Sequence, residues 1–320
     1  MKAALRFELL ALMALMAVVL CVPAHAQSVP ALGSARIVFV GHSLINYDMP
    51  EMVKGLAESK GLGIRRAVQV NNGTNIGNNW LGCRQSTFTG QYAPYEFACD
   101  AIESGTDQGP YDTLIITQVN NPIIDPTNAA NLGSTAEDYE KFLNLFLSKN
   151  ASGRAFFFPP WEGTDSPWLN GQDWTASIAA QMNLFERVTA RIGQISRDTH
   201  GRNATVEIIP SSVALRQLIL AAELGQFADI TNRSQLFLDD VHMSKLGNYF
   251  MACVVFASVY QQSPAGATGR TTGRWGDELT NLPADLALRL QNFAWSAVSS
   301  YRGWTGTAPR PRPPTGITVK

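Results

Sequence analysis

The chain has 320 residues, of which 45% are hydrophobic and 16% are charged, and its formal net charge is −1. A chain of this length and composition can form one large domain or two small ones with a substantial core. Its low and balanced charge argues against a nucleic-acid-binding protein, which usually carries a basic patch.

The first 26 residues are typical of a secretory signal peptide. Lys2 and Arg6 are basic, residues 9–22 are apolar, and residues 24–26 read "AHA", a small-x-small cleavage pattern. We expect cleavage before Gln27 and export to the bacterial periplasm or the extracellular space. The alternative is a membrane anchor, but the apolar stretch is short for a span of about 20 residues. We expect no integral membrane segment after cleavage.

Segments typical of strands and of helices alternate after the signal. Strands are expected at residues 35–41, 65–73, 111–121, 153–161 and 204–212. Helices are expected at residues 49–61, 135–149, 174–201, 245–262 and 283–301. Strands separated by helices predict right-handed crossovers and a parallel sheet between two helix layers. The sequence therefore predicts an α/β fold, a three-layer α/β/α sandwich with a mainly parallel sheet of about five strands.

This domain is expected to span residues 27–303. The last segment, residues 304–320, is rich in proline and is expected to be a disordered tail.

Three cysteines remain after the expected cleavage: Cys83, Cys99 and Cys253. Export favours oxidation, and Cys83 and Cys99 lie close together in a polar segment. We expect them to form a disulfide rather than to stay free thiols. Cys253 lies in the apolar run "YFMACVVFASVY" and is expected to be a buried thiol. The cysteine spacing is not that of a metal site, and neither a metal nor another cofactor is predicted.

Polar residues follow three of the expected strands. Ser43 follows the run "IVFVG", residues 71–73 follow the apolar part of the second segment, and residues 118–121 follow the apolar centre of the third. Ligands of parallel α/β sheets bind at the carboxyl ends of the strands. We therefore expect these clusters at one edge of the sheet, with Ser43 as a nucleophile and not only a helix cap.

His242 is the histidine best placed to act as the base for Ser43. His42 is next to Ser43, but neighbouring side chains point in different directions, so we expect His42 to pack behind the turn. His200 follows a helix and precedes a strand, at the opposite edge of the sheet. His242 lies three residues after Asp239, so the carboxylate can orient the ring while the other ring nitrogen takes the serine proton. The alternative is an ordinary solvated turn near a helix start.

The combination of motifs resembles the SGNH/GDSL hydrolase superfamily over about residues 35–262. "GHSL" matches the block that carries the nucleophile, here Ser43, and "DDVH" matches the block that carries Asp239 and His242. The resemblance implies the flavodoxin-like SGNH hydrolase fold. The closing helix near Trp295 resembles one of an exported, esterase-like branch of this superfamily.

The resemblance also implies an oxyanion hole. "NNGTN" resembles the block of the oxyanion glycine and implies Gly73, with Gly77 as the second choice, and "QVNN" implies Asn120. The backbone amide of Ser43 is the third implied donor. Three positions depart from the usual pattern of the superfamily. His42 stands in place of Asp or Asn, Gln118 in place of Gly, and Asn121 in place of Asp.

Three tryptophans, Trp161, Trp168 and Trp174, lie in one segment after the fourth expected strand. If the tryptophans are exposed, they contact the substrate by stacking on sugars or lining an acyl pocket. The alternative is that they fold inward and form a small satellite core. The resemblance implies hydrolysis of short-chain acyl esters, acetyl esters above all, on a saccharide or on a lipid or small aliphatic alcohol. The alternatives are an exported O-acyltransferase that acts on a glycan and a non-catalytic glycan-binding protein that retains the fold.

Overall fold

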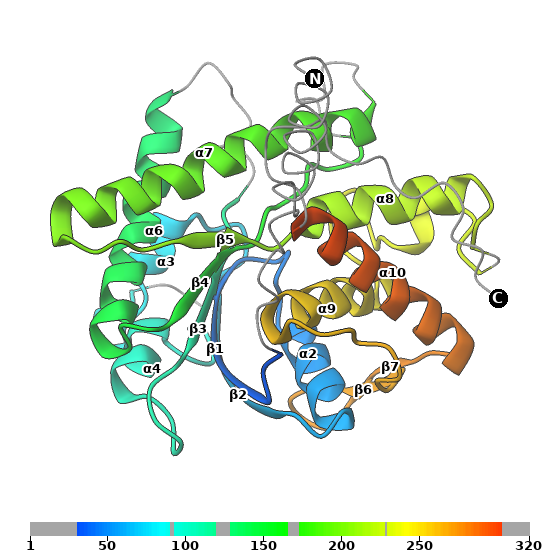
Figure 1. Cartoon of the computed structure of the whole chain (residues 1–320), viewed down its shortest axis with the longest axis horizontal. Coiled ribbons are helices and arrows are strands. Elements are labelled where there is room, and N and C mark those ends of the chain that lie inside the picture. Colours follow the sequence, from blue (N-terminus) through cyan, green and yellow to red (C-terminus); the bar gives the residue numbers. More distant parts are fainter. Residues whose placement is uncertain (1–30, 90–92, 120–128, 166–172, 228, 303–320) are drawn as a thin grey trace, which may run out of the picture. The chain divides into compact units, whose positions relative to one another are not determined.

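The computed structural model describes residues 31–89, 93–119, 129–165, 173–227 and 229–302. The expected signal peptide and the proline-rich tail lie outside the described residues. Five parallel strands form a sheet in the order β2-β1-β3-β4-β5 (Figure 1). The strands are β1 (Ser34–Gly41), β2 (Gly63–Val70), β3 (Thr113–Ile116), β4 (Arg154–Phe157) and β5 (Val206–Ile208). This strand order is the flavodoxin-like one, and the predicted α/β fold with a parallel five-stranded sheet is confirmed.

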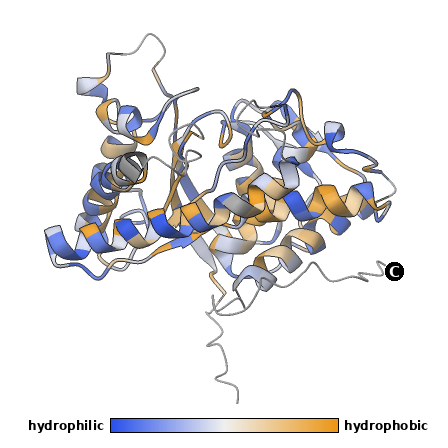
Figure 2. Ribbon diagram, turned by 90° about the horizontal axis from the view of Figure 1, so that it is seen from above, coloured by the Kyte–Doolittle hydropathy of each residue, from blue (hydrophilic) through white to orange (hydrophobic). Residues whose placement is uncertain are grey.

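Helices cover both faces of this sheet (Figure 1). One layer contains α2 (Asp48–Ser59), α8 (Ser211–Glu223), α9 (Lys245–Tyr260) and α10 (Ala284–Arg302). The other contains α3 (Ile76–Leu81), α4 (Ala98–Ser104) and α6 (Ala129–Lys149). The long helix α7 (Trp174–His200) contributes apolar side chains to both layers, and Figure 2 shows polar and apolar residues alternating along it.

The apolar run of β1 is explained by burial on both faces. Ile37 and Phe39 pack into the layer of α2 and α9, whereas Val38 and Val40 pack into the layer of α6. Parallel strands covered by helices on both sides have nearly continuous hydrophobic sequences. β1 lies between β2 and β3, so the carboxyl end of β1 is flanked by the carboxyl ends of these two strands.

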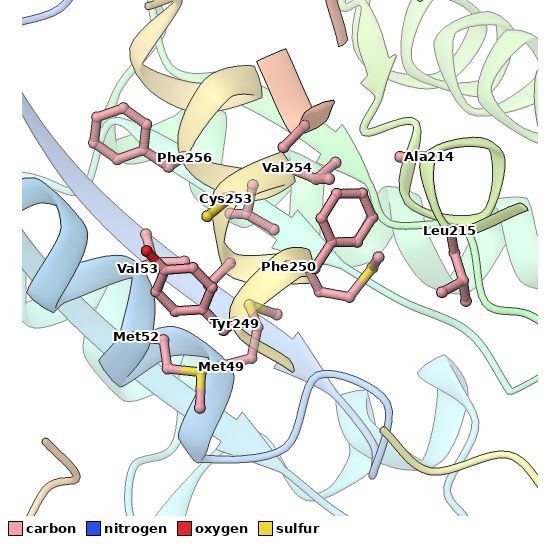
Figure 3. Packing of buried hydrophobic residues seen from close by; sticks show 14 of the residues in the cluster. Met49, Met52, Val53, Ala214, Leu215, Tyr249, Phe250, Cys253, Val254 and Phe256 are labelled. Carbon is pink, nitrogen blue, oxygen red and sulfur yellow. The ribbon is translucent and has the colours of Figure 1, made fainter. Parts of the chain in front are cut away.

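Helix α9 is buried along almost its whole length and anchors the loop that precedes it. Its apolar side chains pack between α2 and α8 (Figure 3). The labelled members of this cluster are Met49, Met52, Val53, Ala214, Leu215, Tyr249, Phe250, Cys253, Val254 and Phe256. Cys253 is a free, buried thiol, and burial raises its pKa. The loop before α9 contains His242, so this packing gives the histidine a rigid support.

Several elements lie outside the predicted pattern, among them the short helices α3 and α4. No helix was predicted at α8, and none of the predicted strands corresponds to the antiparallel hairpin of β6 (Arg270–Thr272) and β7 (Glu278–Asn281). The hairpin packs on α2, where a Cβ at Gly55 would lie 3.2 Å from the Thr271 side chain. Short 3-10 helices are present at η1 (Gln85–Thr87) and η3 (Arg233–Gln235).

A disulfide joins Cys83 and Cys99 across a separation of 16 residues, the pairing expected from the sequence. It connects the segment after α3 to the first turn of α4. In the described parts of the chain, no helix combines the length and the apolar character needed to cross a membrane.

Candidate active site

The chain turns sharply after β1 and brings Ser43 to the carboxyl edge of the sheet. The turn is closed by the amide of Asn46, which donates to the carbonyl of His42 at 3.1 Å. Gly41 is required at its start, because a Cβ there would lie 2.6 Å from Cγ2 of Thr117. The glycine therefore lets β1 and the end of β3 approach closely beside the serine.

Ser43, His242 and Asp239 are connected by hydrogen bonds. Ser43 Oγ lies 2.8 Å from His242 Nε2, and His242 Nδ1 lies 2.7 Å from Asp239 Oδ2. Asp239 Oδ1 accepts from the amides of His242 and Val241, and these bonds, with the ring contact, lower the pKa of Asp239 to about 2. An ionised Asp239 keeps the proton on Nδ1, which leaves Nε2 to accept from the serine hydroxyl. His200 ends α7, at the opposite edge of the sheet.

Backbone hydrogen bonds shape the loop that carries His242. The amide of Leu238 donates to the carbonyl of His242 at 2.8 Å, and the amide of Ser244 donates to the carbonyl of Leu236 at 2.9 Å. The Ser244 hydroxyl then caps α9 by accepting from the amide of Gly247. These bonds fix the loop at the start of α9, and so they fix the position of Asp239 relative to His242.

Of the two alternatives for the tryptophan segment, substrate contact or inward folding, Trp161 and Trp174 follow the second, because both are buried. Their exposed fractions are 0% and 2%. The indole N–H of Trp174 donates to the carbonyl of Glu162 at 2.7 Å, inside the protein. The inward-folded alternative holds for both, because each large ring gains more from burial than from exposure to water. Trp168 lies outside the described residues.

The segment after β4 supports the histidine loop instead. The indole N–H of Trp161 donates to the carbonyl of Val241 at 2.8 Å, and the amide of Thr164 donates to the carbonyl of Asp240 at 2.7 Å. A Cβ at Gly163 would lie 2.8 Å from Asp240 Oδ2. The Asp240 carboxylate therefore lies against this segment, away from the ring that Asp239 holds.

The loop after β2 brings Gly73 to the same edge of the sheet. The amide of Asn71 donates to the carbonyl of Gly41 at 3.0 Å, and Gly73 has a left-handed φ of +67° that favours glycine. Gly77 has a different reason to be glycine. It lies in α3, where a Cβ would come within 2.4 Å of the Asp138 carboxylate. Asn120, the third expected oxyanion donor, lies outside the described residues, as does Asn121.

His42 and Gln118, two of the departures from the SGNH pattern, lie together behind the turn. Burial lowers the pKa of His42 to about 4, although an interaction with the backbone of Gln118 opposes this. The buried Gln118 side chain accepts from the amide of Ile76 at 2.9 Å and donates to the hydroxyl of Thr135 at 3.0 Å. His42 is thus a neutral packing residue, and Gln118 connects the end of β3 to α3 and α6.

A pair of asparagines that the sequence analysis missed joins the two halves of the site. Asn46 has a φ of 44° and caps α2, accepting from the amides of Asp48 and Met49 at 2.8 and 2.9 Å. Its Nδ2 donates to Oδ1 of Asn248 at 3.0 Å, and Asn248 Nδ2 donates to the carbonyl of Met243 at 3.3 Å. The position of Asn46 just before an expected helix is the signal that could have identified it as a cap.

Asn79, also missed, supports the ends of β1 and β2. It is fully buried, and its Nδ2 donates to the carbonyl of Gly41 at 3.2 Å. Its Oδ1 accepts from the side-chain amides of Asn71 and Gln69. Nothing in the sequence distinguishes this asparagine from the others in the segment.

The comparisons with known proteins establish the fold. No family model matches the sequence, and no curated protein matches it. The structure is similar to a DUF4886 family protein from Bacteroides uniformis, with a TM-score of 0.59 and 10% identity over 83% of this chain and 95% of that one.

Weaker similarity extends to two esterases of known structure. The acetyl xylan esterase AlAXEase has a TM-score of 0.42 and 16% identity, over 70% of this chain and 99% of that one. Axe2, an acetylxylan esterase from Geobacillus stearothermophilus, has a TM-score of 0.41 and 16% identity, over 73% and 98%. The strand order and the helix layers define the fold of this chain as a three-layer α/β/α sandwich with a flavodoxin-like sheet.

Proposed function

We propose that the chain is an exported serine ester hydrolase of the SGNH/GDSL type that cleaves short-chain acyl esters. The observation that carries this proposal is the pair of hydrogen bonds that joins Ser43 to His242 at 2.8 Å and His242 to Asp239 at 2.7 Å. A serine hydroxyl is a weak nucleophile until an adjacent base removes its proton. These three side chains supply the nucleophile, the base and the acid that orients the base.

In the first half of the reaction, Ser43 attacks the ester carbonyl carbon. A bond forms from Oγ to this carbon while the hydroxyl proton moves to Nε2 of His242. The carbonyl oxygen becomes an oxyanion, and donors already in place stabilise it. The proposed donors are the amides of Ser43 and Gly73 and the side-chain amide of Asn120, the last on the sequence motif alone.

The intermediate then collapses and the acyl enzyme is hydrolysed. The bond to the alcohol oxygen breaks, and His242 gives its proton to the departing alcohol, leaving the acyl group on Ser43. A water molecule attacks this acyl group while His242 takes its proton, and the carboxylic acid leaves as Ser43 recovers its hydroxyl. Asp239 stays ionised throughout and stabilises the imidazolium.

The acyl group is proposed to be short, with acetyl preferred, because the sequence resembles SGNH hydrolases that remove acetyl groups. Export is proposed from the signal-like residues 1–26. Serine attack requires no Lewis acid, so a chelator should leave turnover unchanged.

The test is active-site labelling combined with a panel of esters. A fluorophosphonate probe should label the mature protein once, and Ser43→Ala should abolish both the labelling and the hydrolysis of aryl acetates. Labelling and turnover that survive this substitution would contradict the proposal. Transfer of the acyl group to an added sugar, with no free acetate, would identify an acyltransferase instead.

A further inference from the structure

Three aromatic side chains, here called the aromatic platform, are in contact with one another near the candidate active site: Tyr47, Tyr95 and Trp275. Tyr47 is half-buried, the Tyr47 and Tyr95 rings are tilted by 59°, and the Tyr95 and Trp275 rings meet edge to face at 78°. The ring centroids of Tyr47 and Tyr95 are 4.6 Å apart, and those of Tyr95 and Trp275 are 5.1 Å apart. Tyr95 is 52% exposed and Trp275 is 70% exposed. Large aromatic side chains are often buried, so two exposed rings in contact with each other require an explanation.

The platform lies at the same edge of the sheet as Ser43. Tyr47 follows Ser43 by four residues, at the end of the same turn, and its hydroxyl donates to the carbonyl of Val70 at 3.1 Å. Val70 is the last residue of β2, the strand beside β1. The platform therefore begins at the carboxyl ends of the two strands that position Ser43 and Gly73.

Trp275 is held in this place by the β6–β7 hairpin. The amide of Gly273 donates to the carbonyl of Asp277 at 2.7 Å, which closes the tip that carries the indole. Lys245, in the first turn of α9, donates to the carbonyl of Glu278 at 2.9 Å. The hairpin is thus attached both to α2, through Thr271, and to the helix that follows the histidine loop.

A groove continues from the platform across the loop after β2. Its volume is about 1280 Å³, above the roughly 300–1,000 Å³ that suits one small ligand. Its described lining combines aromatic rings with amides and a hydroxyl, including Tyr47, Tyr95, Trp80, Asn71, Asn78 and Thr74. This lining suits an extended ligand that has both apolar faces and many hydroxyl groups.

The charges beside the groove favour a neutral ligand. Arg84 is paired with Glu103, with Nη2 and Oε1 at 2.8 Å, and Arg274 is paired with Glu96 at 3.3 Å. Arg274 also lies over the Tyr95 ring, 5.4 Å from its centroid. Because each of these two arginines already has an acidic partner, neither is prepared to bind a phosphate or a carboxylate.

We propose that the groove and platform bind the alcohol part of the ester, and that this part is a neutral oligosaccharide. Sugar rings would place their apolar C–H faces on Tyr95 and Trp275, while their hydroxyl groups bond to the amides of Asn71 and Asn78. This inference rests on the proposed function, because it assigns the group that leaves from Ser43. The proposed sugar-binding aromatics are therefore Tyr95 and, in the hairpin, Trp275, and not the buried Trp161 and Trp174.

The first test measures binding without catalysis. Calorimetry on the Ser43→Ala protein would use xylohexaose, cellohexaose and chitohexaose as neutral probes, and hexagalacturonate as an anionic one. We expect a neutral probe to bind more tightly than the anionic one. Trp275→Ala and Tyr95→Ala, each combined with Ser43→Ala, should weaken that binding roughly tenfold, the loss typical of one aromatic contact.

Two control variants separate stacking from general damage. Tyr95→Phe keeps the ring face and should retain the affinity, whereas Leu224→Ala removes an apolar side chain that is 74% exposed at the end of α8 and should have no effect. Absence of binding by all three neutral probes, or equal binding by the Trp275→Ala protein, would overturn the inference.

The second test uses the catalytically intact chain. For Trp275→Ala, the ratio of KM for an acetylated oligosaccharide to KM for an aryl acetate should rise roughly tenfold. A rise that appears instead with longer aryl esters would show that the groove holds an acyl chain, and would also overturn the inference.

The two proposals can fail separately. If the probe does not label Ser43 in the wild-type chain but oligosaccharides still bind, the hydrolase proposal is rejected and the groove remains a saccharide-binding site. If labelling and aryl acetate turnover are normal but no oligosaccharide binds, the hydrolase proposal stands and the saccharide-binding groove is rejected.

Discussion

Asn46 and Asn248 are 202 residues apart in sequence, and their side chains are joined by a hydrogen bond of 3.0 Å. Asn46 ends the turn that carries Ser43, and Asn248 lies in the first turn of the helix that follows His242. The bond therefore connects the nucleophile turn to the start of α9. Asn248 also binds the carbonyl of Met243, the residue after the histidine.

We predict that this bridge positions Ser43 against His242. Asn248→Leu should lower kcat for an aryl acetate about tenfold and raise KM little, because the bridge sets geometry and does not contact substrate. Asn46→Asp keeps a cap acceptor for α2 but removes the donor of the bridge. The two substitutions combined should cost less than the product of their separate effects. Fully multiplicative effects on kcat would contradict a shared role.

Asp239 and Asp240 should differ sharply in their importance. Asp239→Asn should lower kcat by about 10³–10⁴-fold, because an amide at this position no longer holds the catalytic tautomer. Asp240→Asn should change kcat little, because its carboxylate lies against Gly163. Steady-state kinetics on one ester would measure both, and the opposite ranking would show that the orienting acid was misassigned.

His42 should make the folded state sensitive to mildly acidic pH. Burial lowers its pKa from 6.5 to about 4, so between these pH values the unfolded chain binds a proton that the folded chain does not. The stabilisation is thus complete above pH 6.5 and is lost as the pH falls toward 4, by about 3 kcal/mol for this group.

The measurement is urea unfolding of the wild type and of His42→Asn at several pH values from 4 to 7. The free energy of unfolding should fall less steeply with acid in the variant, which has no ring to protonate. An electrostatic interaction with His242 also lowers the pKa of His42, so His242→Gln provides a second comparison. Parallel curves for wild type and His42→Asn would show that His42 titrates normally.

The Cys83–Cys99 disulfide should stabilise the segment that lines the groove. Its removal by Cys83→Ser with Cys99→Ser should cost about 3 kcal/mol, as expected for a closed loop of about this length. Urea unfolding with and without reductant would measure it, and reductant should affect the wild type but not the double variant. Non-reducing peptide mapping that finds both thiols free would contradict the pairing.

Much of the fold could be predicted because local patterns carry it. The apolar runs of β1 and β3, the helix-period segments between strands, and the turn at Gly41 are each readable over a few residues. The Asp239–His242 pair is also local, since three residues of one loop bring the carboxylate to the ring. Helix α8 has the same kind of pattern, with Ala214, Leu215, Leu218 and Ile219 buried, and could have been predicted.

Contacts between distant segments were decided only by the tertiary structure. Ser43 and His242 are 199 residues apart, and their contact depends on how α9 packs against α2. Trp161 is a second example of a contact between distant segments, because its buried indole donates to the carbonyl of Val241, 80 residues later in the chain. A sequence records which side chains are apolar, polar or titratable. Whether a tryptophan in a loop faces the solvent or the interior depends on which surface the rest of the chain brings against it.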